Sequence, residues 1–290
     1  MPKIRLDTLL IDQNFFDSKQ KAQAAVMGKI VKVDDKIIDK PGTMIKEDAV
    51  ITLTAELDSK YVSRGGFKLE KAINEFQPII TDNIFLDIGA STGGFTDCLL
   101  KNGAKFVYAI DVGYGQINWS IRQNESVKVI ERCNARNLTG AELYTENQPK
   151  ANAAVMDVSF ISIEKIIPNL IAELLDKDFF IIALVKPQFE AGKENLKKGV
   201  VISADVHKKV LINFARFCQK NNLDLRKITY SPIKGPSGNI EFLAYIQPAQ
   251  VIESPVLDTE NTEIDENAID EKVMTKILSI VDAAHKALKD

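Results

Sequence analysis

The sequence predicts an α/β protein, with a mostly parallel sheet of seven strands covered by helices on both faces and a small α+β module before it. Three observations support this fold class. Between residues 84 and 246, short apolar segments alternate with segments of helical spacing, as in chains whose parallel strands are joined by helices. The first sixty residues mix helical spacing with short β-rich pieces. A glycine-rich turn follows the first long apolar segment.

The N-terminal module begins with two predicted helices, at residues 5–15 and 18–27. Ser18 can cap the second helix, and Gly28 suits its end. β-Rich pieces follow at residues 30–33, 36–38 and 50–54, with turns at Asp34-Asp35 and Pro41-Gly42 between them.

Seven apolar segments are the predicted strands of the sheet: 84–88, 106–110, 127–130, 153–157, 179–185, 225–230 and 241–246. The last two are separated by Pro232 and the turn Gly235-Pro236-Ser237-Gly238, so we expect an antiparallel hairpin at one edge. A helical stripe formed by Val273, Ile277, Ile280, Val281, Ala284 and Leu288 predicts a last helix that packs on the body of the protein.

These segments define the expected domain organisation. The predicted parts are the module at 1–57, a linker at 58–63, the sheet domain at 64–250, an acidic connector at 251–267 and a C-terminal helix at 268–290. Residues 251–290 hold ten acidic and four basic side chains, a charge of −6, whereas the whole chain carries −3. The remainder is therefore about +3, and the acidity does not argue against an RNA partner.

Composition excludes several classes of function. The chain has no apolar run of about 18 residues and no signal-like N-terminus, so we expect neither a membrane span nor secretion, but a cytoplasmic protein. Its three cysteines are far apart and its two histidines, His207 and His285, form no ligand pattern, so no metal site is expected. We expect the cysteines to be buried apolar residues and the histidines to lie at the surface.

The turn from Asp87 to Gly94 is the most informative motif. Its glycines lack Cβ, so the backbone can bend sharply and approach a ligand, and Asp87 can bind an amine or a hydroxyl. The pattern Asp-x-Gly-x-x-x-Gly-Gly differs from Gly-x-Gly-x-x-Gly and contains no basic residue. Asp111 ends the next strand, where an acidic residue binds ribose hydroxyls, although it could also form a turn. These details favour S-adenosylmethionine over a nicotinamide or flavin.

Four charged residues lie at or near the ends of predicted strands, where an open α/β sheet binds its substrates. They are Lys68, Asp157, Lys186 and Glu241. Charges at the ends of apolar strands are costly to desolvate unless they are paired or used in the function.

Five motifs resemble the TlyA family of haemolysin-like ribosomal RNA methyltransferases, relatives of the FtsJ-type ribose 2′-O-methyltransferases. They are Tyr61-Val-Ser-Arg-Gly-Gly-Phe-Lys-Leu-Glu, Asp87-Ile-Gly-Ala-Ser-Thr-Gly-Gly-Phe-Thr, Asp157-Val-Ser-Phe-Ile-Ser, Leu184-Val-Lys-Pro-Gln-Phe-Glu and Gly235-Pro-Ser-Gly-Asn-Ile-Glu-Phe. The module, with its Arg-Leu-Asp-x-x-Leu start, resembles the S4-like RNA-binding domain.

The resemblance implies a Rossmann-like class I methyltransferase that uses S-adenosylmethionine to methylate the ribose 2′-hydroxyl of cytidine in rRNA of one or both ribosomal subunits. The implied catalytic set is Lys68, Asp157, Lys186 and Glu241. The candidate cofactor-binding residues are Asp87, Gly89, Ala90, Ser91, Thr92, Gly93, Gly94, Asp111, Cys133, Asn134 and Asp157. The candidate RNA contacts are Arg5, Lys19, Lys21, Lys29 and Arg64, with solvated surface side chains as the alternative.

We expect Lys186 to engage the hydroxyl, Asp157 and Glu241 to hold the lysines, and Lys68 to help position the nucleotide. Whether Lys186 acts as a base or only orients the hydroxyl stays open. Asp157-Val-Ser-Phe is not the Asn/Asp-Pro-Pro-aromatic motif of base N-methyltransferases, which favours oxygen as the acceptor. The alternatives are a non-catalytic rRNA-binding assembly factor and a haemolysin.

A basic stretch follows Lys186 and is a further candidate for contact with the RNA backbone. It comprises Lys193, Lys197, Lys198, Lys208 and Lys209. A solvated loop is the alternative interpretation.

Overall fold

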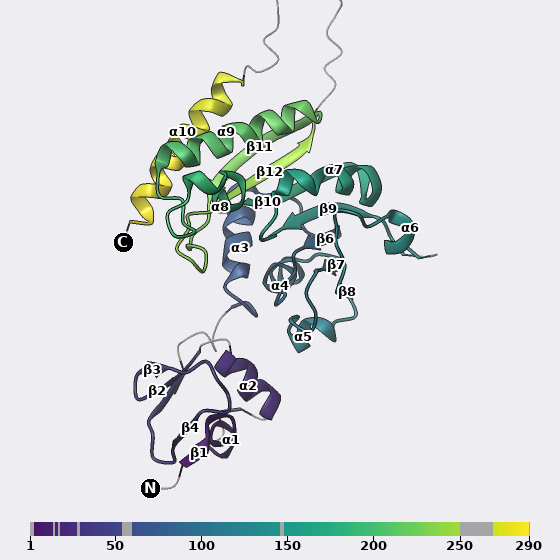
Figure 1. Cartoon of the computed structure of the whole chain (residues 1–290). Helices are drawn as coiled ribbons and strands as arrows, with labels where there is room; N and C mark the ends of the chain where they lie inside the picture. The colour runs from purple at the N-terminus through teal and green to yellow at the C-terminus, as the bar shows by residue number, and fades with distance from the viewer. Residues whose placement is uncertain are drawn as a thin grey trace, which may run out of the picture. The chain divides into compact units, whose positions relative to one another are not determined.

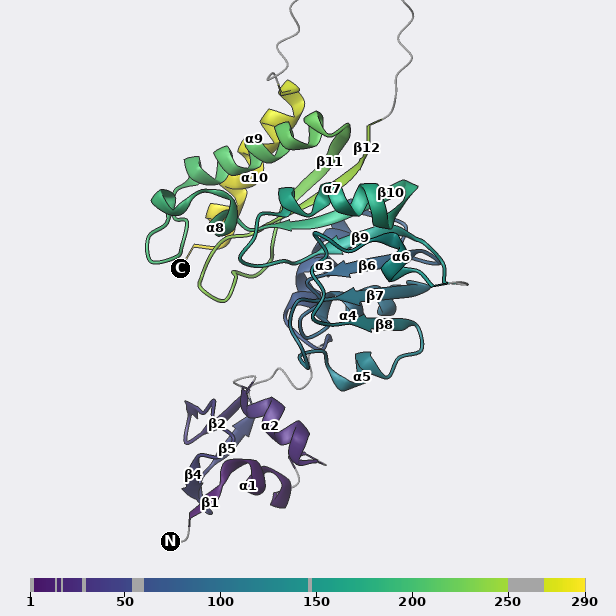
Figure 2. The same ribbon diagram turned by 45° about the vertical axis from the view of Figure 1, so that its right-hand side comes forward.

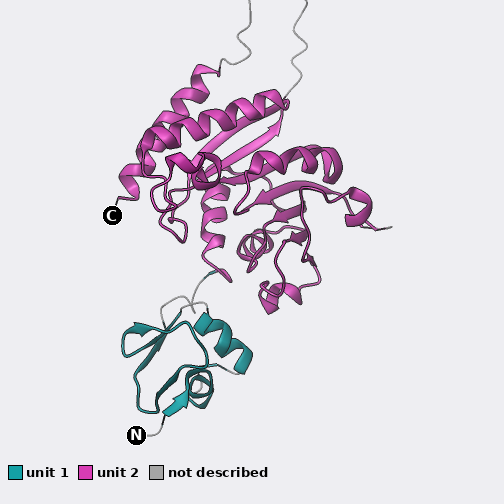
Figure 3. Ribbon diagram, viewed as in Figure 1, with its two compact units in different colours: residues 1–60 teal, residues 61–290 magenta. Residues whose placement is uncertain are grey.

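The computed structural model describes residues 3–13, 15–16, 18–27, 30–53, 60–145, 148–249 and 269–289. The chain divides into two compact units, Met1–Lys60 and Tyr61–Asp290 (Figure 3). Gly28, Lys29 and the predicted acidic connector at 251–267 lie outside the described residues.

The first unit is an α+β module with two helices and short antiparallel strands. Its elements are β1 (Lys3–Arg5), α1 (Leu6–Asp12), α2 (Lys19–Met27), β2 (Val31–Val33), β3 (Lys36–Ile37), β4 (Met44–Lys46) and β5 (Ile51–Leu53). β1 pairs with β4, and β2 lies between β3 and β5. The predicted cap is present, since the Ser18 Oγ accepts a hydrogen bond from the Lys21 backbone N–H at 3.3 Å. Leu6, Leu10 and Val26 are fully buried in its core.

The first predicted helix of this module is shorter than expected. Arg5 belongs to the strand β1 instead, and α1 runs only from Leu6 to Asp12. The turn at Asp34-Asp35 is confirmed, with both residues at positive φ, 48° and 63°, between the antiparallel strands β2 and β3. That backbone geometry matches the twist of a tight hairpin.

The second unit is built on one seven-stranded sheet, as predicted (Figures 1 and 2). Its strands are β6 (Ile84–Ile88), β7 (Phe106–Ile110), β8 (Val127–Ile130), β9 (Ala151–Met156), β10 (Leu175–Val185), β11 (Leu223–Tyr230) and β12 (Phe242–Pro248). The order is β11-β12-β10-β9-β6-β7-β8, and β12 is antiparallel to both of its neighbours. The predicted hairpin is therefore confirmed, and β11 is its edge strand.

Helices connect and cover these strands. They are α3 (Gly65–Phe76), α4 (Gly94–Lys101), α5 (Trp119–Arg122), α6 (Gly140–Leu143), α7 (Ile167–Asn169), α8 (Pro187–Glu190), α9 (Ala204–Lys220) and α10 (Glu271–Ala287). Alternate strand residues face opposite sides. Phe85 and Val107 pack with α3 and α4, whereas Leu86 and Tyr108 belong to the core under α7, α9 and α10. Both faces are thus buried, which explains why the strands are continuously apolar.

The C-terminal helix packs on the body of the unit, as predicted, through the buried residues Ile277, Val281 and Ala284. The expectation that both histidines lie at the surface is wrong. His207 is fully buried, because it falls on the inner stripe of α9 with Val210 and Leu211. His285 of α10 is half-buried, and its Nε2 lies 2.8 Å from His207 Nδ1.

This histidine pair predicts a pH-dependent stability. Burial and, to a smaller extent, the neighbouring His285 lower the pKa of His207 to about 4. An ion pair between Lys208 of α9 and Asp282 of α10, at 2.9 Å, lies between the same two helices as the histidine pair. The unfolded chain binds a proton on His207 below about pH 6.5 while the folded protein does not, so stability should fall from pH 6.5 to pH 4, by on the order of 3 kcal/mol.

Urea unfolding of the wild type and of His207→Gln between pH 6.5 and 4.5 measures this effect as a difference in slope. We expect a flatter dependence for His207→Gln, since the residue no longer titrates. Parallel pH profiles for the two proteins would contradict the prediction.

Cys98 and Cys218 are buried as expected, Cys133 is half-buried, and none of the three forms a disulfide. Among the residues that the structure describes, no helix is long and apolar enough to cross a membrane.

Candidate active site

The register of the sheet gathers the charged residues predicted for the site. Met156 pairs with Ala183 and Val185 pairs with Phe242, so the residues next to them, Asp157, Lys186 and Glu241, meet at one edge. This is the carboxyl edge of the parallel strands, and Glu241 reaches it because β12 runs in the opposite direction.

Lys68, from the first turn of α3, completes a chain of alternating charges. The Lys68 Nζ donates to the Glu241 Oε2 at 2.6 Å and lies 4.0 Å from the Asp157 Oδ2. The Lys186 Nζ lies 2.6 Å from the Asp157 Oδ1 and donates to the Ser159 Oγ at 2.8 Å. Each lysine is thus paired with its own carboxylate, and Asp157 lies between the two ammonium groups.

The four groups are largely removed from water. Glu241 is 1% exposed, Lys68 7% and Lys186 8%, and the side chain of Asp157 is 20% exposed. Charges buried to this extent are tolerated only when they are paired and hydrogen-bonded. The four formal charges sum to zero, and Asp157 is the member most open to solvent.

The glycine turn lies directly against the charged set of Lys68, Asp157, Lys186 and Glu241. Gly89 has a φ of +84°, and a Cβ there would lie 2.7 Å from the backbone oxygen of Asp157. At Gly94 a Cβ would lie 2.2 Å from the Ser63 Oγ and 3.0 Å from the Gly66 backbone nitrogen, in the segment that leads into α3. Only glycine at these two positions allows the turn to pack between Asp157 and the start of α3.

Asp87 presents an unused hydrogen-bond acceptor inside the turn. Its carboxylate is fully buried, and its Oδ2 accepts from the Thr96 hydroxyl at 2.6 Å. Its Oδ1 has no hydrogen-bond partner in the described part of the chain. Burial raises the pKa of Asp87 to about 7, with Asp157 and Asp111 adding to the rise and the Thr96 hydrogen bond opposing it. A cationic or donor group would satisfy this atom.

Asp111 joins the turn to the ends of the next strands. Its carboxylate oxygens accept from the backbone N–H groups of Ser91 at 2.7 Å and Gly113 at 2.6 Å, and its carbonyl accepts from the Cys133 N–H at 3.0 Å. Asp111 therefore forms a turn, as one of the two sequence interpretations held. A carboxylate oxygen can accept a second hydrogen bond, so its predicted contact with ribose hydroxyls is compatible with this role.

The predicted RNA contacts of the first unit differ in their surroundings. Arg5 donates from its Nε and Nη2 to the Asp7 carboxylate at 2.9 and 2.7 Å, and Gln23 donates to the same group at 2.8 Å. These hydrogen bonds, led by that of Arg5, lower the pKa of Asp7 to about 2. The guanidinium fork of Arg5 is thus used within the unit, whereas Lys19 and Lys21 are exposed.

Two hydrogen-bond partners of the charged set and one exposed ring near it in the sequence were not predicted. Ser159 accepts a hydrogen bond from Lys186, and the Gln188 Nε2 donates to the Glu241 Oε1 at 3.3 Å. The exposed ring is that of Phe160, three residues after Asp157. Phe160 is 91% exposed, adopts a φ of +66° and lies 5.2 Å from the ring of Phe189. The motifs Asp157-Val-Ser-Phe and Lys186-Pro-Gln-Phe each place a polar residue two positions and a phenylalanine three positions after the charged residue. This repetition in the sequence could have drawn attention to Ser159, Gln188 and Phe160.

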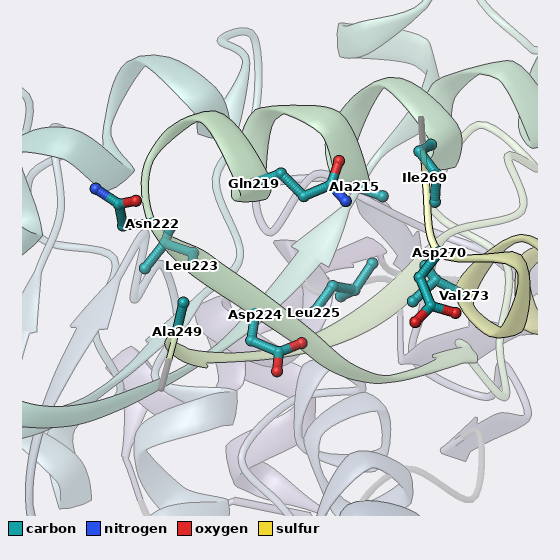
Figure 4. Close-up of a pocket in the computed structure, with 10 residues that line it drawn as sticks. All are labelled: Ala215, Gln219, Asn222, Leu223, Asp224, Leu225, Ala249, Ile269, Asp270 and Val273. Carbon is teal, nitrogen blue, oxygen red and sulfur yellow. The ribbon is translucent and has the colours of Figure 1, made fainter. Parts of the chain in front are cut away.

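A separate pocket of about 310 Å³ lies among the end of α9, the start of β11 and the start of α10 (Figure 4). Leu223 and Asp224 line it, and they begin β11, a strand parallel to β10. The pocket therefore lies at the amino edge of the sheet, opposite to the charged set. Within the described ranges, no group of three or more His, Cys, Asp or Glu side chains could hold a metal ion.

Comparison with known proteins decides the family. The model of the FtsJ-like methyltransferase family matches residues 61–247. The chain belongs to the FtsJ-like methyltransferase family. The S4 domain model matches residues 4–51, so this FtsJ-like protein carries the N-terminal S4 domain that its sequence resembles.

Similar proteins place this FtsJ-like methyltransferase among the TlyA proteins, as the resemblance implied. YqxC of Bacillus subtilis is 43% identical over 289 residues, which is 99% of this chain and 96% of that protein. A Mycobacterium tuberculosis protein named 16S/23S rRNA (cytidine-2′-O)-methyltransferase TlyA is 35% identical over 246 residues, 84% of this chain and 90% of the relative. A solved structure from Streptococcus thermophilus carries the name hemolysin. It is 38% identical with a TM-score of 0.70, and the match covers 100% of this chain and 98% of the solved chain.

Proposed function

We propose that this methyltransferase transfers a methyl group from S-adenosylmethionine to the ribose 2′-hydroxyl of a cytidine in ribosomal RNA. The observation that carries the proposal is the buried set of two lysines and two carboxylates directly against the glycine turn. The name of the M. tuberculosis relative supports rRNA and cytidine as the substrate. The S4 domain supports an RNA partner.

The residues of the turn fit S-adenosylmethionine. The unpartnered Oδ1 of Asp87 suits the cationic amine of its methionine part, and Asp111 suits its ribose hydroxyls. Gly89 and Gly93 give the backbone room at positive φ, and Ser91, Thr92, Cys133 and Asn134 lie on the same strand-end loops. When bound, the cofactor supplies an electrophilic methyl group.

Lys186 is the residue we assign to the hydroxyl. Two of the three N–H bonds of its ammonium point to Asp157 and Ser159, which leaves one donor for the 2′-oxygen. This third contact would hold the oxygen in line with the methyl group. Because an ammonium nitrogen has no lone pair, the proton that the hydroxyl loses on methylation would pass to the Asp157 carboxylate, which Lys186 holds at 2.6 Å. Lys68, held by Glu241, would position the nucleotide.

Phe160 supports an unstacked nucleotide as the substrate. An exposed phenylalanine at positive φ is unfavourable both for solvation and for the backbone, and such strain is concentrated at functional sites. It lies three residues after Asp157, where a base could stack on its ring. A target base held there would bring its own ribose toward Lys186.

Mass mapping of rRNA ribose methylation in cells with and without this protein tests the proposal. We expect one or more cytidines to lose a ribose methyl group when the protein is absent. Unchanged ribose methylation, combined with tight binding of the protein to rRNA, would support a non-catalytic assembly factor instead. Release of dye from liposomes by the pure protein would support the haemolysin named among its relatives.

The assignment of Asp87 predicts a pH-dependent cofactor affinity. A bound amine cation favours the ionised carboxylate, so binding should weaken as Asp87 takes up a proton below its pKa of about 7. From pH 7.5 to pH 6 we expect the Kd for S-adenosylmethionine to rise roughly tenfold.

Titration calorimetry at these pH values measures the affinity. Asp87→Asn should bind more weakly and lose the pH dependence. Asp97→Asn is the control, because Asp97 pairs with Lys101 on α4 and should leave the pH dependence intact. An affinity that is the same at both pH values in the wild type would contradict the role of Asp87.

A further inference from the structure

The basic stretch after Lys186 separates into parts with different surroundings. Lys208 forms an ion pair with Asp282 of α10 at 2.9 Å, so it helps to dock the C-terminal helix. Lys197 and Lys198 are exposed, and neither has a salt-bridge partner among the residues that the structure describes. These two lysines therefore present charge that the fold itself does not use.

Lys197 and Lys198 occupy a tight hairpin between α8 and α9. The backbone N–H of Lys197 donates to the Val200 carbonyl at 2.9 Å, and the N–H of Val200 donates back to Lys197 at 3.1 Å. The two central residues, Lys198 and Gly199, have φ values of +51° and +81°. This left-handed pair favours Asn-Gly or Gly-Gly, so a lysine at the first position is unfavourable for the backbone.

The hairpin is fixed to the loop that carries Glu241. The side chain of Asn239, which is 1% exposed, donates to the Gly199 carbonyl at 3.0 Å and accepts from the Val201 N–H at 2.9 Å. The Asn239 backbone in turn accepts from the Gly235 N–H at 2.9 Å. Both loops lie at the edge toward which the parallel strands point (Figure 2). The hairpin is therefore anchored to Asn239, two residues before Glu241, at the same edge of the sheet as the charged set.

We propose that the Lys197-Lys198 hairpin is a phosphate clamp that holds the RNA backbone next to the target nucleotide. The inference rests on the proposed function, since it concerns the substrate of the same site. Unpaired ammonium groups at adjacent positions match adjacent phosphates, which position a nucleic acid without reading its sequence. Lys198 occupies a left-handed position that favours asparagine, and the presence of a lysine there agrees with a use for its charge.

Binding of protein-free rRNA at several salt concentrations tests the clamp independently of methyl transfer. The test variant is Lys197→Gln with Lys198→Asn, which removes both charges and suits the left-handed turn, so the fold should be kept. We expect its Kd to rise about tenfold and the slope of log K against log salt to fall by about 1 to 2. With ribosomal subunits as substrate, KM should rise while kcat stays about the same.

Two matched variants serve as controls. Lys197→Arg with Lys198→Arg keeps the charges and should bind as the wild type does. Lys105→Gln removes another exposed lysine, which precedes β7 at the amino edge of the sheet, and should also leave binding unchanged.

Wild-type affinity and salt slope in the charge-removing variant would overturn the clamp even if methyl transfer to rRNA is observed. A loss seen only with whole subunits, and not with protein-free rRNA, would overturn it in favour of a contact with a ribosomal protein. If the wild type methylates no RNA but its RNA affinity depends on the two lysines, the proposed function fails and the clamp stands.

Discussion

Replacing Lys186 with methionine is expected to lower kcat for methyl transfer to rRNA by about 10³-fold, while the Kd for S-adenosylmethionine changes by no more than about twofold. The reason is geometric. Lys186 is held by Asp157 at 2.6 Å and by Ser159 at 2.8 Å, and its remaining N–H is the donor assigned to the 2′-oxygen. Methionine keeps about the volume of the side chain but removes the ammonium group, and with it the contacts to Asp157 and Ser159.

Single-turnover methyl transfer to ribosomal subunits, with cofactor binding measured in parallel, checks this expectation. Lys128→Met is a suitable control, because the Lys128 Nζ also makes two hydrogen bonds, to the Leu143 carbonyl and Gln148, but lies on β8. Near-full transfer by Lys186→Met would contradict the assignment.

Glu241→Ala is expected to destabilise the second unit by about 3–5 kcal/mol, because it leaves the buried ammonium of Lys68 without its partner at 2.6 Å. The nearest other carboxylate, that of Asp157, lies 4.0 Å away. The double variant Lys68→Met with Glu241→Leu removes both charges and should recover most of the lost stability, since an apolar pair of similar volume needs no partner.

Unfolding in urea, followed by hydrogen exchange at the backbone amides of β10 and β12, measures these changes in the second unit alone. The double variant should be inactive although it is stable, which separates the catalytic role of the pair from its contribution to folding. Two results would argue against a buried, paired Lys68. One is a loss of less than about 1 kcal/mol in the free energy of unfolding of Glu241→Ala, and the other is a double variant that is no more stable than Glu241→Ala.

The sheet could be predicted closely where apolar runs are bounded by turns. The strands β6, β7 and β8 begin and end as predicted. β10 begins four residues before the predicted start, at Leu175, because Asp176, Lys177 and Asp178 are exposed on a strand whose remainder is buried. β1 and β4 were not predicted, since each has only three residues and takes its stability from pairing with the other.

The members of the candidate site could be predicted, but their pairing could not. Lys68 and Glu241 are separated by 173 positions in the sequence, so the choice of Glu241 rather than Asp157 as the partner of Lys68 depends on how β12 is inserted beside β10. The unused oxygen of Asp87 and the position of Phe160 are likewise properties of packing and of backbone conformation. The burial of His207 depends on the face of α9 that meets the sheet, which composition does not reveal.

The most direct test of ribose methylation is mass analysis of the nucleosides released from rRNA after reaction with the pure protein and S-adenosylmethionine. The proposed chemistry predicts cytidine with one added methyl group on the ribose, formed by the wild type and absent with Lys186→Met. A methyl group found on a base, or equal amounts of product from both proteins, would contradict it.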